Sequence, residues 1–235
     1  MTKIVVANQK NILNYHEVMD FLNQIRGKIP KNNVIFCPSY PYLLDYVREG
    51  YLVGSQDVSE TNKVVTGEVS VSMLSSLTVK YALIGHTERR INKNETEKDI
   101  VKKIKELITN DITPLFCIGE MNEEKFEDVI QRLKNTFQNL TLDEIKKIFI
   151  CYEPMDAIGT NKEIDVQELE DKIKKMKETI LKEYHTNTKV LYGGSVDSEN
   201  VKEILNISVL DGVFLGSASI QSSEFLKIIE VAVTM

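Results

Sequence analysis

Residues 81–90 read YALIGHTERR, and this stretch decides the fold. It begins with a short apolar run, 81–84, that ends at a glycine and a histidine. Since the run is apolar almost throughout rather than alternating, it is typical of a parallel strand that is buried on both faces. The later segment 97–108 places Ile100 and Ile104 at helical spacing and predicts an amphipathic helix. The stretch therefore predicts a strand followed by a helix, which is one βα unit.

The same pattern recurs along the whole chain. Seven more short apolar runs occur, at 4–7, 34–37, 51–54, 113–118, 148–152, 189–192 and 212–215. No linker rich in glycine, serine or proline divides the 235 residues, so we expect one domain that covers residues 1–235. Eight βα units in this length predict the α/β class and a closed (β/α)8 barrel. An open, doubly wound sheet is the alternative, because periodicity does not distinguish the two.

Composition and charge exclude several classes of protein. The chain has 29 Lys and Arg residues against 35 Asp and Glu, a net charge of −6, whereas a nucleic-acid-binding protein needs a basic face. No apolar stretch reaches the roughly 18 residues of a membrane span. The cysteines, Cys37, Cys117 and Cys151, are odd in number and widely spaced, which favours reduced thiols over disulfides or a zinc site. We therefore expect a cytoplasmic protein that binds neither nucleic acid nor a membrane.

The few glycines of the chain are concentrated where the predicted strands end. Seven of the 11 lie at or just beyond the end of a run: Gly54, Gly85, Gly119, Gly159, Gly193, Gly194 and Gly216. In a (β/α)8 barrel the carboxyl ends of all strands meet on one face, which carries the chemistry. Lys10, His86 and Glu153 follow runs in the same way. The sequence thus predicts that a lysine, a histidine, a carboxylate and several glycine-flanked amides converge on that face.

Glu153 and His86 are the candidates for proton transfer. Glu153 follows a buried run and precedes Pro154, which favours extended backbone and a side chain that projects into the barrel mouth. A carboxylate there can take a proton from a carbon next to a carbonyl, but an isolated glutamate can equally cap a helix or form a salt bridge. From the residue types, His86 can play a structural role or, less readily, bind a metal together with Glu88 and Glu153. The residue types alone leave these alternatives open.

Lys10 and two glycine-containing turns are the candidates for anion binding. A fixed cation at this face stabilises a phosphate or a developing oxyanion, and an ordinary surface lysine is the alternative. The turns at 193–195 and 216–217 consist of glycine and serine, which lets backbone N–H groups approach an anion. Barrels of this class commonly bind phosphate with the loops after the seventh and eighth strands. A tight turn is the alternative role for the paired glycines.

Five segments resemble the signatures of the triosephosphate isomerase family, whose fold is the TIM barrel. They are 8–10 (Asn-x-Lys), 66–70 (TGEVS), 85–90 (GHTERR), 152–154 (YEP) with 157–160 (AIGT), and 191–196 (LYGGSV). The segments occur in the family's order and at compatible spacing, so the similarity covers essentially the whole chain. One of them would be weak evidence, but five in order identify the chain as a member of the family.

The resemblance implies an isomerase of glycolysis and gluconeogenesis that uses no metal and no organic cofactor. Its substrate is a small phosphorylated sugar, because the family interconverts dihydroxyacetone phosphate and D-glyceraldehyde 3-phosphate through an enediol or enediolate. It makes Glu153 the group that moves the proton, His86 a neutral electrophile beside a helix N-terminus, and Lys10 the stabilising cation. The substrate-binding residues that it implies are Asn8, Lys10, Gly159, Ser195, Gly216 and Ser217.

The resemblance also implies a homodimer and exposes some departures from the family pattern. The loop from Thr66 to Ser70 resembles the arm with which family members dock onto a neighbouring subunit near its Lys10. Gln9 and Asp156 stand where many members have tryptophan, but no proton-transfer residue is lost. An isomerase of a four-carbon tetrulose phosphate and a phosphosugar-binding barrel without catalysis are the alternative functions.

Overall fold

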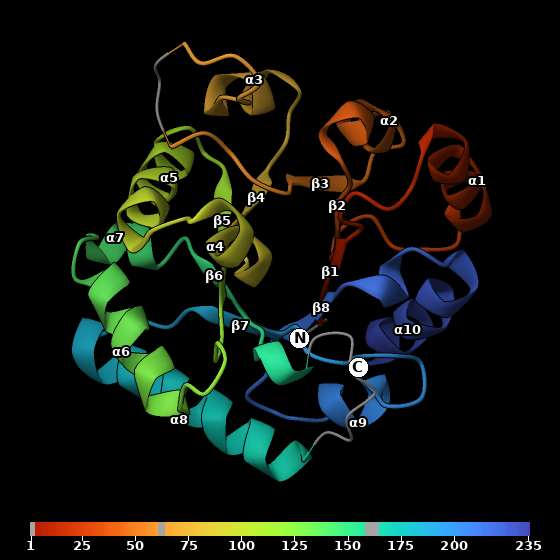
Figure 1. Cartoon of the computed structure of the whole chain (residues 1–235). Helices are drawn as coiled ribbons and strands as arrows, with labels where there is room; N and C mark the ends of the chain where they lie inside the picture. Colours follow the sequence, from red (N-terminus) through yellow and green to blue (C-terminus); the bar gives the residue numbers. More distant parts are fainter. Residues whose placement is uncertain (1–2, 61–63, 158–164) are drawn as a thin grey trace.

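The structure is a computed structural model, and it describes residues 3–60, 64–157 and 165–235. Eight parallel strands follow one another around a closed barrel, and the last pairs with the first (Figure 1). The strands are β1 (Ile4–Asn8), β2 (Val34–Cys37), β3 (Leu52–Ser55), β4 (Tyr81–Ile84), β5 (Thr113–Ile118), β6 (Phe149–Tyr152), β7 (Lys189–Tyr192) and β8 (Gly212–Leu215). The predicted (β/α)8 barrel is confirmed, and the open sheet is wrong. The predicted strand bounds agree to within one residue.

At least one α-helix follows every strand, and the helices lie on the outside of the barrel (Figure 1). They are α1 (Tyr15–Ile25), α2 (Leu43–Arg48), α3 (Val71–Ser76), α4 (Thr87–Lys93), α5 (Glu97–Thr109), α6 (Phe126–Phe137), α7 (Leu142–Ile145), α8 (Val166–Tyr184), α9 (Val201–Leu205) and α10 (Ser222–Thr234). Short 3-10 helices occur in loops: η1 (Tyr40–Tyr42), η2 (Met155–Ala157) and η3 (Ser217–Ser219).

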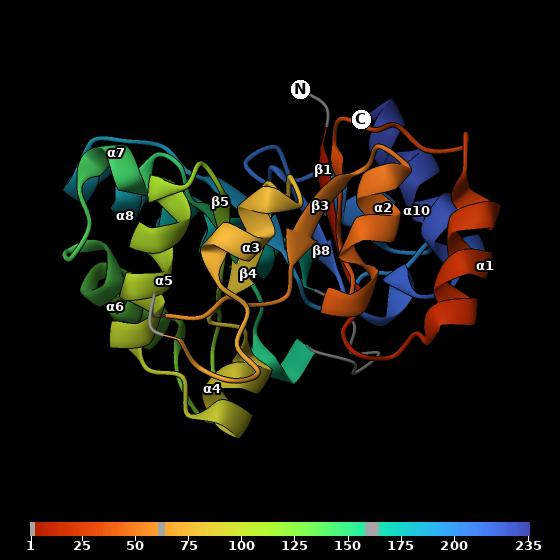
Figure 2. The same cartoon turned by 90° about the horizontal axis from the view of Figure 1, so that it is seen from above.

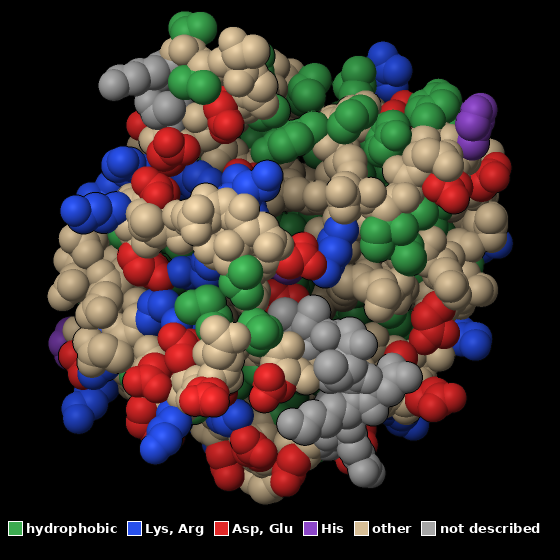
Figure 3. Space-filling view, viewed as in Figure 1, with side chains coloured by type: hydrophobic (Ala, Val, Ile, Leu, Met, Phe, Trp, Pro, Cys, Tyr) green, Lys and Arg blue, Asp and Glu red, His purple; other side chains and the backbone are tan. Residues whose placement is uncertain are grey.

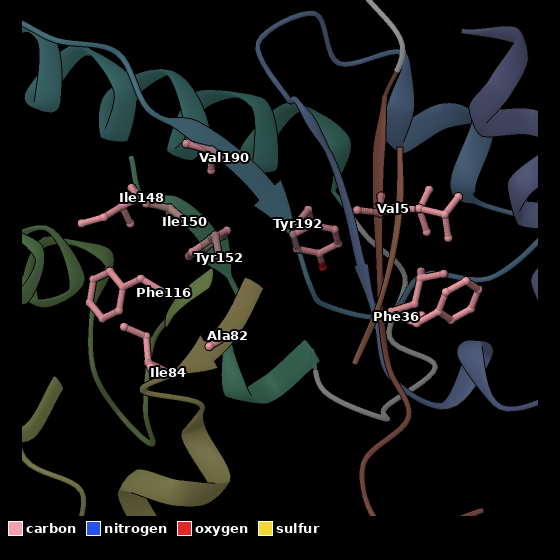
Figure 4. Packing of buried hydrophobic residues seen from close by; sticks show 14 of the residues in the cluster. Val5, Phe36, Ala82, Ile84, Phe116, Ile148, Ile150, Tyr152, Val190 and Tyr192 are labelled. Atoms are coloured by element: carbon pink, nitrogen blue, oxygen red, sulfur yellow. The ribbon is translucent and has the colours of Figure 1, made fainter. Parts of the chain in front are cut away.

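Strand side chains alternate between two cores. Outward-facing side chains such as Val5, Phe36 and Phe116 pack between the barrel and its helices (Figure 4). Inward-facing side chains form a second cluster inside the barrel: Val6, Ile35, Cys37, Leu83, Leu115, Cys117, Cys151, Leu191 and Phe214. Both faces of each strand are therefore buried, which is why the runs are continuously apolar. The cysteines are free and buried in the second cluster, and burial raises the pKa of Cys37 and Cys117.

Side-chain caps determine where several helices begin. In front of α5, Thr96 accepts a hydrogen bond from the backbone N–H of Asp99, and the Asp99 carboxylate accepts one from the backbone N–H of Thr96. In front of α8, the Asp165 carboxylate accepts a hydrogen bond from the backbone N–H of Glu168. Such caps satisfy N–H groups that the first helical turn leaves free. The helix predicted from periodicity at 97–108 is confirmed as α5.

The carboxyl ends of the strands lie on one face of the barrel, which Figure 1 views from outside. In Figure 2 this C-terminal face carries α4 and η2, whereas the C-terminus of the chain lies at the opposite end. No helix among the residues that the structure describes is long and apolar enough to cross a membrane. The candidate residues, which follow the strands, are therefore expected at the C-terminal face.

Candidate active site

Glu153 and His86 face one another at the C-terminal face. Glu153 follows β6 directly, and its backbone N–H donates to the carbonyl of Ile118 at 2.9 Å, which ties it to β5. Its Oε2 lies 3.1 Å from Nε2 of His86, and both side chains are about 95% buried. The two atoms are not aligned for a hydrogen bond, and neither has another partner among the described residues. Because buried polar atoms are normally paired, this pair is poised to bind polar atoms of a ligand.

His86 is oriented by the helix that it caps. Its Nδ1 accepts a hydrogen bond from the backbone N–H of Glu88 at 3.3 Å, in the first turn of α4. A ring nitrogen that accepts carries no proton, so in the neutral imidazole the proton is on Nε2, the atom that faces Glu153. The edge of the ring packs against Phe214, with centroids 6.1 Å apart. The site therefore presents an N–H donor next to a carboxylate.

Lys10 follows β1 at the same face, and its backbone conformation is unusual. Its φ of 51° lies in the left-handed region, which costs free energy for a residue other than glycine. The carbonyl of Lys10 accepts hydrogen bonds from Ser39 Oγ at 2.8 Å and Gln56 Nε2 at 2.6 Å, and its N–H donates to Asn8 Oδ1 at 3.2 Å. The Lys10 ammonium lies 2.5 Å from Glu88 Oε1. These contacts fix both the strained turn and the direction of the cation.

Four of the candidate side chains line one cavity of about 350 Å³. They are Asn8, Lys10, His86 and Glu88. In Figure 3, which views the same face, basic and acidic side chains meet near the centre. The structure thus brings Lys10 together with His86 and Glu88, which lie 76 and 78 residues further along the sequence.

The turns after β7 and β8 lie beside this cavity. The N–H of Gly193 donates to the carbonyl of Tyr152 at 2.8 Å, which places the first turn next to Glu153. A Cβ built on Gly216 would lie 3.9 Å from Cε of Lys10, so the second turn adjoins the cation. Ser195 is partly exposed, and Ser217 opens η3 at the exposed end of the second turn. The structure therefore brings both predicted anion-binding turns to the C-terminal face.

The metal alternative for His86 is not supported by the geometry. The ring presents Nε2 to Glu153 at 3.1 Å and Nδ1 to Glu88 at 3.8 Å, so the two carboxylates lie at opposite nitrogens. One ion cannot bind both carboxylates and a single ring nitrogen in that arrangement. Within residues 3–60, 64–157 and 165–235, no group of three or more His, Cys, Asp or Glu side chains could hold a metal ion.

Comparison with known proteins identifies the family to which this chain is similar. A family model described as triosephosphate isomerase matches residues 3–232. The triosephosphate isomerase of Lactobacillus gasseri is 35% identical over 97% of this chain and 98% of its own length. The chain belongs to the triosephosphate isomerase family. Proteins of the same name from Alkaliphilus oremlandii and Mycoplasma capricolum are 32% and 33% identical over 96% and 97% of this chain, and over 98% and 97% of their own lengths.

Membership of the triosephosphate isomerase family makes the chain an isomerase, an intramolecular oxidoreductase of the aldose–ketose type. One residue that the family resemblance predicts for the phosphate site, Gly159, lies outside the described residues. Of the two positions where many triosephosphate isomerases have tryptophan, Gln9 is buried beneath the site and Asp156 lies in η2. Both departures therefore leave Glu153 and His86 in place.

Sequence reasoning missed the group that supports the end of β6. The hydroxyl of Tyr152 donates to both carboxylate oxygens of Glu120 at 2.9 Å, and Lys172 of α8 lies 3.1 Å from Glu120 Oε1. Burial raises the pKa of Tyr152, and it raises the pKa of Tyr192 to about 12, so both hydroxyls stay protonated at neutral pH. Glu120 follows β5 as the other candidates follow their strands, and that position was the available signal.

Gly119 controls the position of Glu153 because no side chain fits there. A Cβ on this residue would lie 2.0 Å from the carbonyl oxygen of Glu153, which is backbone and cannot rotate away. We expect Gly119→Ala to displace Glu153 and to lower kcat about 100-fold, as is typical when a reacting group moves by about 1 Å. Steady-state kinetics on the folded variant measures the effect.

Gly27→Ala is the control for the glycine substitution. Gly27 has a φ of 73°, but a Cβ there meets nothing within 4 Å. The control therefore adds backbone strain without a clash at the site, and it should lower stability while leaving kcat near the wild-type value. If Gly119→Ala retained wild-type kcat, the close approach of the two backbones would not matter for catalysis.

Proposed function

We propose that the chain interconverts dihydroxyacetone phosphate and D-glyceraldehyde 3-phosphate by proton transfer through an enediol or enediolate. The observation that carries this proposal is the facing pair at the C-terminal face, Glu153 Oε2 and His86 Nε2, which lie 3.1 Å apart without hydrogen-bond partners among the described residues. A base and an N–H donor at this separation can contact a carbon-bound proton and the neighbouring carbonyl oxygen of one small substrate.

Each side chain has a distinct role in this reaction. The Glu153 carboxylate removes a proton from C1 of the ketose and returns it to C2 of the intermediate. The aldose forms when a proton also passes from the oxygen on C1 to the oxygen on C2. The N–H at Nε2 of His86 donates a hydrogen bond to the oxygen on which negative charge develops, and the Lys10 ammonium stabilises the same charge. Glu88 holds that ammonium in position through their 2.5 Å contact.

The phosphate group of the substrate is assigned to the turns after β7 and β8. Ser195, Gly216 and Ser217 offer backbone N–H groups at the C-terminal face, and Lys10 adds positive charge beside Gly216. Gly159 and Asn8 complete the proposed binding set.

A coupled isomerase assay on the purified protein tests this function. Turnover of the three-carbon phosphates is expected, and a clear preference for a four-carbon tetrulose phosphate would overturn the assignment of substrate. Turnover no faster than that of Glu153→Gln would overturn the assignment of the enzyme and favour a phosphosugar-binding barrel. We place this reaction in the cytoplasm, where buried free thiols such as Cys117 stay reduced.

A homodimer is the second part of the proposal. Hydrophobic side chains gather over α2 and α3 (Figure 3). Val65, in the segment before α3, and Met73 of α3 are about half exposed. They flank the loop from Thr66 to Ser70. The cavity that holds Lys10 extends to Arg89, and we propose that the 66–70 loop of a second copy docks beside it. Burying this apolar surface in a dimer removes it from water.

We expect sedimentation velocity to give the mass of two chains for the wild-type protein. Met73→Lys is expected to shift the protein to the monomer, because a charge then replaces an exposed apolar side chain in the interface. Leu142→Lys is the matched control, since Leu142 is similarly exposed on α7, away from this surface. An unchanged dimer with Met73→Lys, or a monomeric wild type, would contradict the proposed interface.

A further inference from the structure

A buried amide links the two sides of the proposed phosphate site. Gln9 lies between Asn8 and Lys10, and its side chain is buried although it is polar. Its Oε1 accepts a hydrogen bond from the hydroxyl of Tyr46 at 2.7 Å, and its Nε2 donates to the carbonyl of Ser219 at 3.3 Å. The side chain therefore connects β1 to α2 on one side and to the turn after β8 on the other.

Ser219 closes the turn that is assigned to the phosphate. Its backbone N–H and its hydroxyl both donate to the carbonyl of Gly216, at 2.9 Å and 2.6 Å. The turn from Gly216 to Ser219 is thus one hydrogen-bonded unit, and the carbonyl of Ser219 accepts the hydrogen bond from Gln9. Gln9 is therefore connected, through Ser219, to the turn that contains the backbone N–H groups of Gly216 and Ser217.

The tyrosine end of the link is what orients the amide. Tyr46 of α2 is fully buried in the core, where its ring packs against Phe36 with centroids 5.0 Å apart. A buried hydroxyl has to donate its proton to an acceptor, and Gln9 Oε1 is that acceptor. Because one end of the amide is an acceptor and the other a donor, this hydrogen bond selects the orientation in which Nε2 faces Ser219.

We propose that Gln9, oriented by Tyr46, is a positioning residue for phosphate binding. It holds the turn from Gly216 to Ser219 at a set distance from Lys10, the next residue along the chain. The two groups that meet the phosphate, a cation and a set of backbone amides, are then fixed relative to one another by a single side chain. The inference rests on the proposed function in that it takes this turn as the phosphate site.

The test compares Gln9→Met and Tyr46→Phe with the wild-type protein. Methionine removes both hydrogen bonds at nearly constant volume, and phenylalanine removes only the one that orients the amide. Loss of a hydrogen bond is typically equivalent to about fivefold in an equilibrium constant. We expect Gln9→Met to raise KM and to weaken binding of inorganic phosphate by about that factor. We expect kcat to fall less than KM rises, and Tyr46→Phe to shift both quantities in the same direction.

Tyr184→Phe is the matched control. Its hydroxyl donates to the carbonyl of Lys134 at 3.3 Å, far from the C-terminal turns, so its loss should alter stability but not the affinity for phosphate. Gln9→Leu also lacks the amide oxygen and the amide nitrogen, so we expect it to bind phosphate as weakly as Gln9→Met does. A positioning role is overturned if Gln9→Met and Tyr46→Phe both bind phosphate as tightly as Tyr184→Phe while all three remain folded.

Calorimetric binding of inorganic phosphate separates this inference from the proposed function, because it needs no turnover. Weakened phosphate binding in the Gln9 and Tyr46 variants supports the positioning role even if the wild-type protein lacks isomerase activity. Normal isomerase activity with unaltered phosphate binding in both variants overturns the positioning role and leaves the proposed function standing. If Gln9→Met does not fold, Tyr46→Phe alone decides, since it deletes one oxygen atom and keeps the ring in the core.

Discussion

Replacement of Glu153 by glutamine is expected to lower kcat about 100- to 10,000-fold, the range that general acid–base catalysis contributes. The amide has nearly the size and shape of the carboxylate but cannot accept the proton. Glu153 forms no side-chain hydrogen bond among the described residues, so the substitution removes chemistry rather than structural support. The coupled isomerase assay measures kcat, and circular dichroism checks the fold.

Two controls accompany this prediction. Glu123→Gln makes the same chemical change at an exposed position near the C-terminal face and should leave kcat unchanged. Glu153→Asp keeps the carboxylate but withdraws it by about one methylene, and a misplacement of about 1 Å typically costs about 100-fold in rate. A Glu153→Gln enzyme within tenfold of the wild-type kcat would contradict the assignment of Glu153 as the base.

The barrel could be predicted from the sequence because its strands are buried on both faces. That burial makes runs such as Val34–Cys37 continuously apolar, and such runs are visible without knowledge of their neighbours. The sequence could also predict on which face of the barrel the candidate site lies, since the parallel strands of a barrel all end on the same face. The motif of each strand end then supplied the individual residues, including His86 and Glu153.

The contacts that organise the site could not be predicted in the same way. The proton position on His86 depends on a single backbone N–H in α4, and the orientation of Gln9 depends on Tyr46, which a different helix brings beneath it. Such contacts depend on side-chain rotamers and on packing between distant segments, which residue patterns do not encode. Lys103 shows this limit of prediction most clearly, because a pattern of polar and apolar residues predicts that a lysine is exposed to solvent.

Lys103 instead lies on the buried face of α5, among Ile100, Ile104 and Leu107. Its ammonium contacts Asp57 Oδ1 at 2.7 Å and also contacts Glu95, and all three side chains are at least 90% buried. Arg89 of α4 binds the other oxygen of Asp57 at 2.5 Å. This network joins the segment after β3 to α4 and α5, next to the cavity that holds Lys10.

We expect Lys103→Met to lower the free energy of unfolding by about 3–5 kcal/mol, the usual cost of removing one partner from a buried ion pair. Methionine matches the length of the lysine chain but leaves two buried carboxylates without their shared cation. Urea denaturation of both proteins measures the difference. Lys102→Met is the matched control, because Lys102 is the exposed neighbour and lies 3.7 Å from Asp99. Equal losses in the two variants would contradict a structural role for the buried network.

The stability that Lys103→Met loses should depend on pH, because the buried carboxylates bind protons. Burial already raises the pKa of Asp57 in the folded protein, despite Lys103 and Arg89 beside it, and removal of Lys103 raises it further. A carboxyl whose pKa is higher in the folded than in the unfolded state binds its proton more tightly when folded. The folded variant is therefore favoured at low pH and loses stability as the pH rises through that pKa. The difference from the wild-type protein should thus be larger at pH 8 than at pH 5, whereas a loss that arose only from poorer packing of methionine would be the same at both.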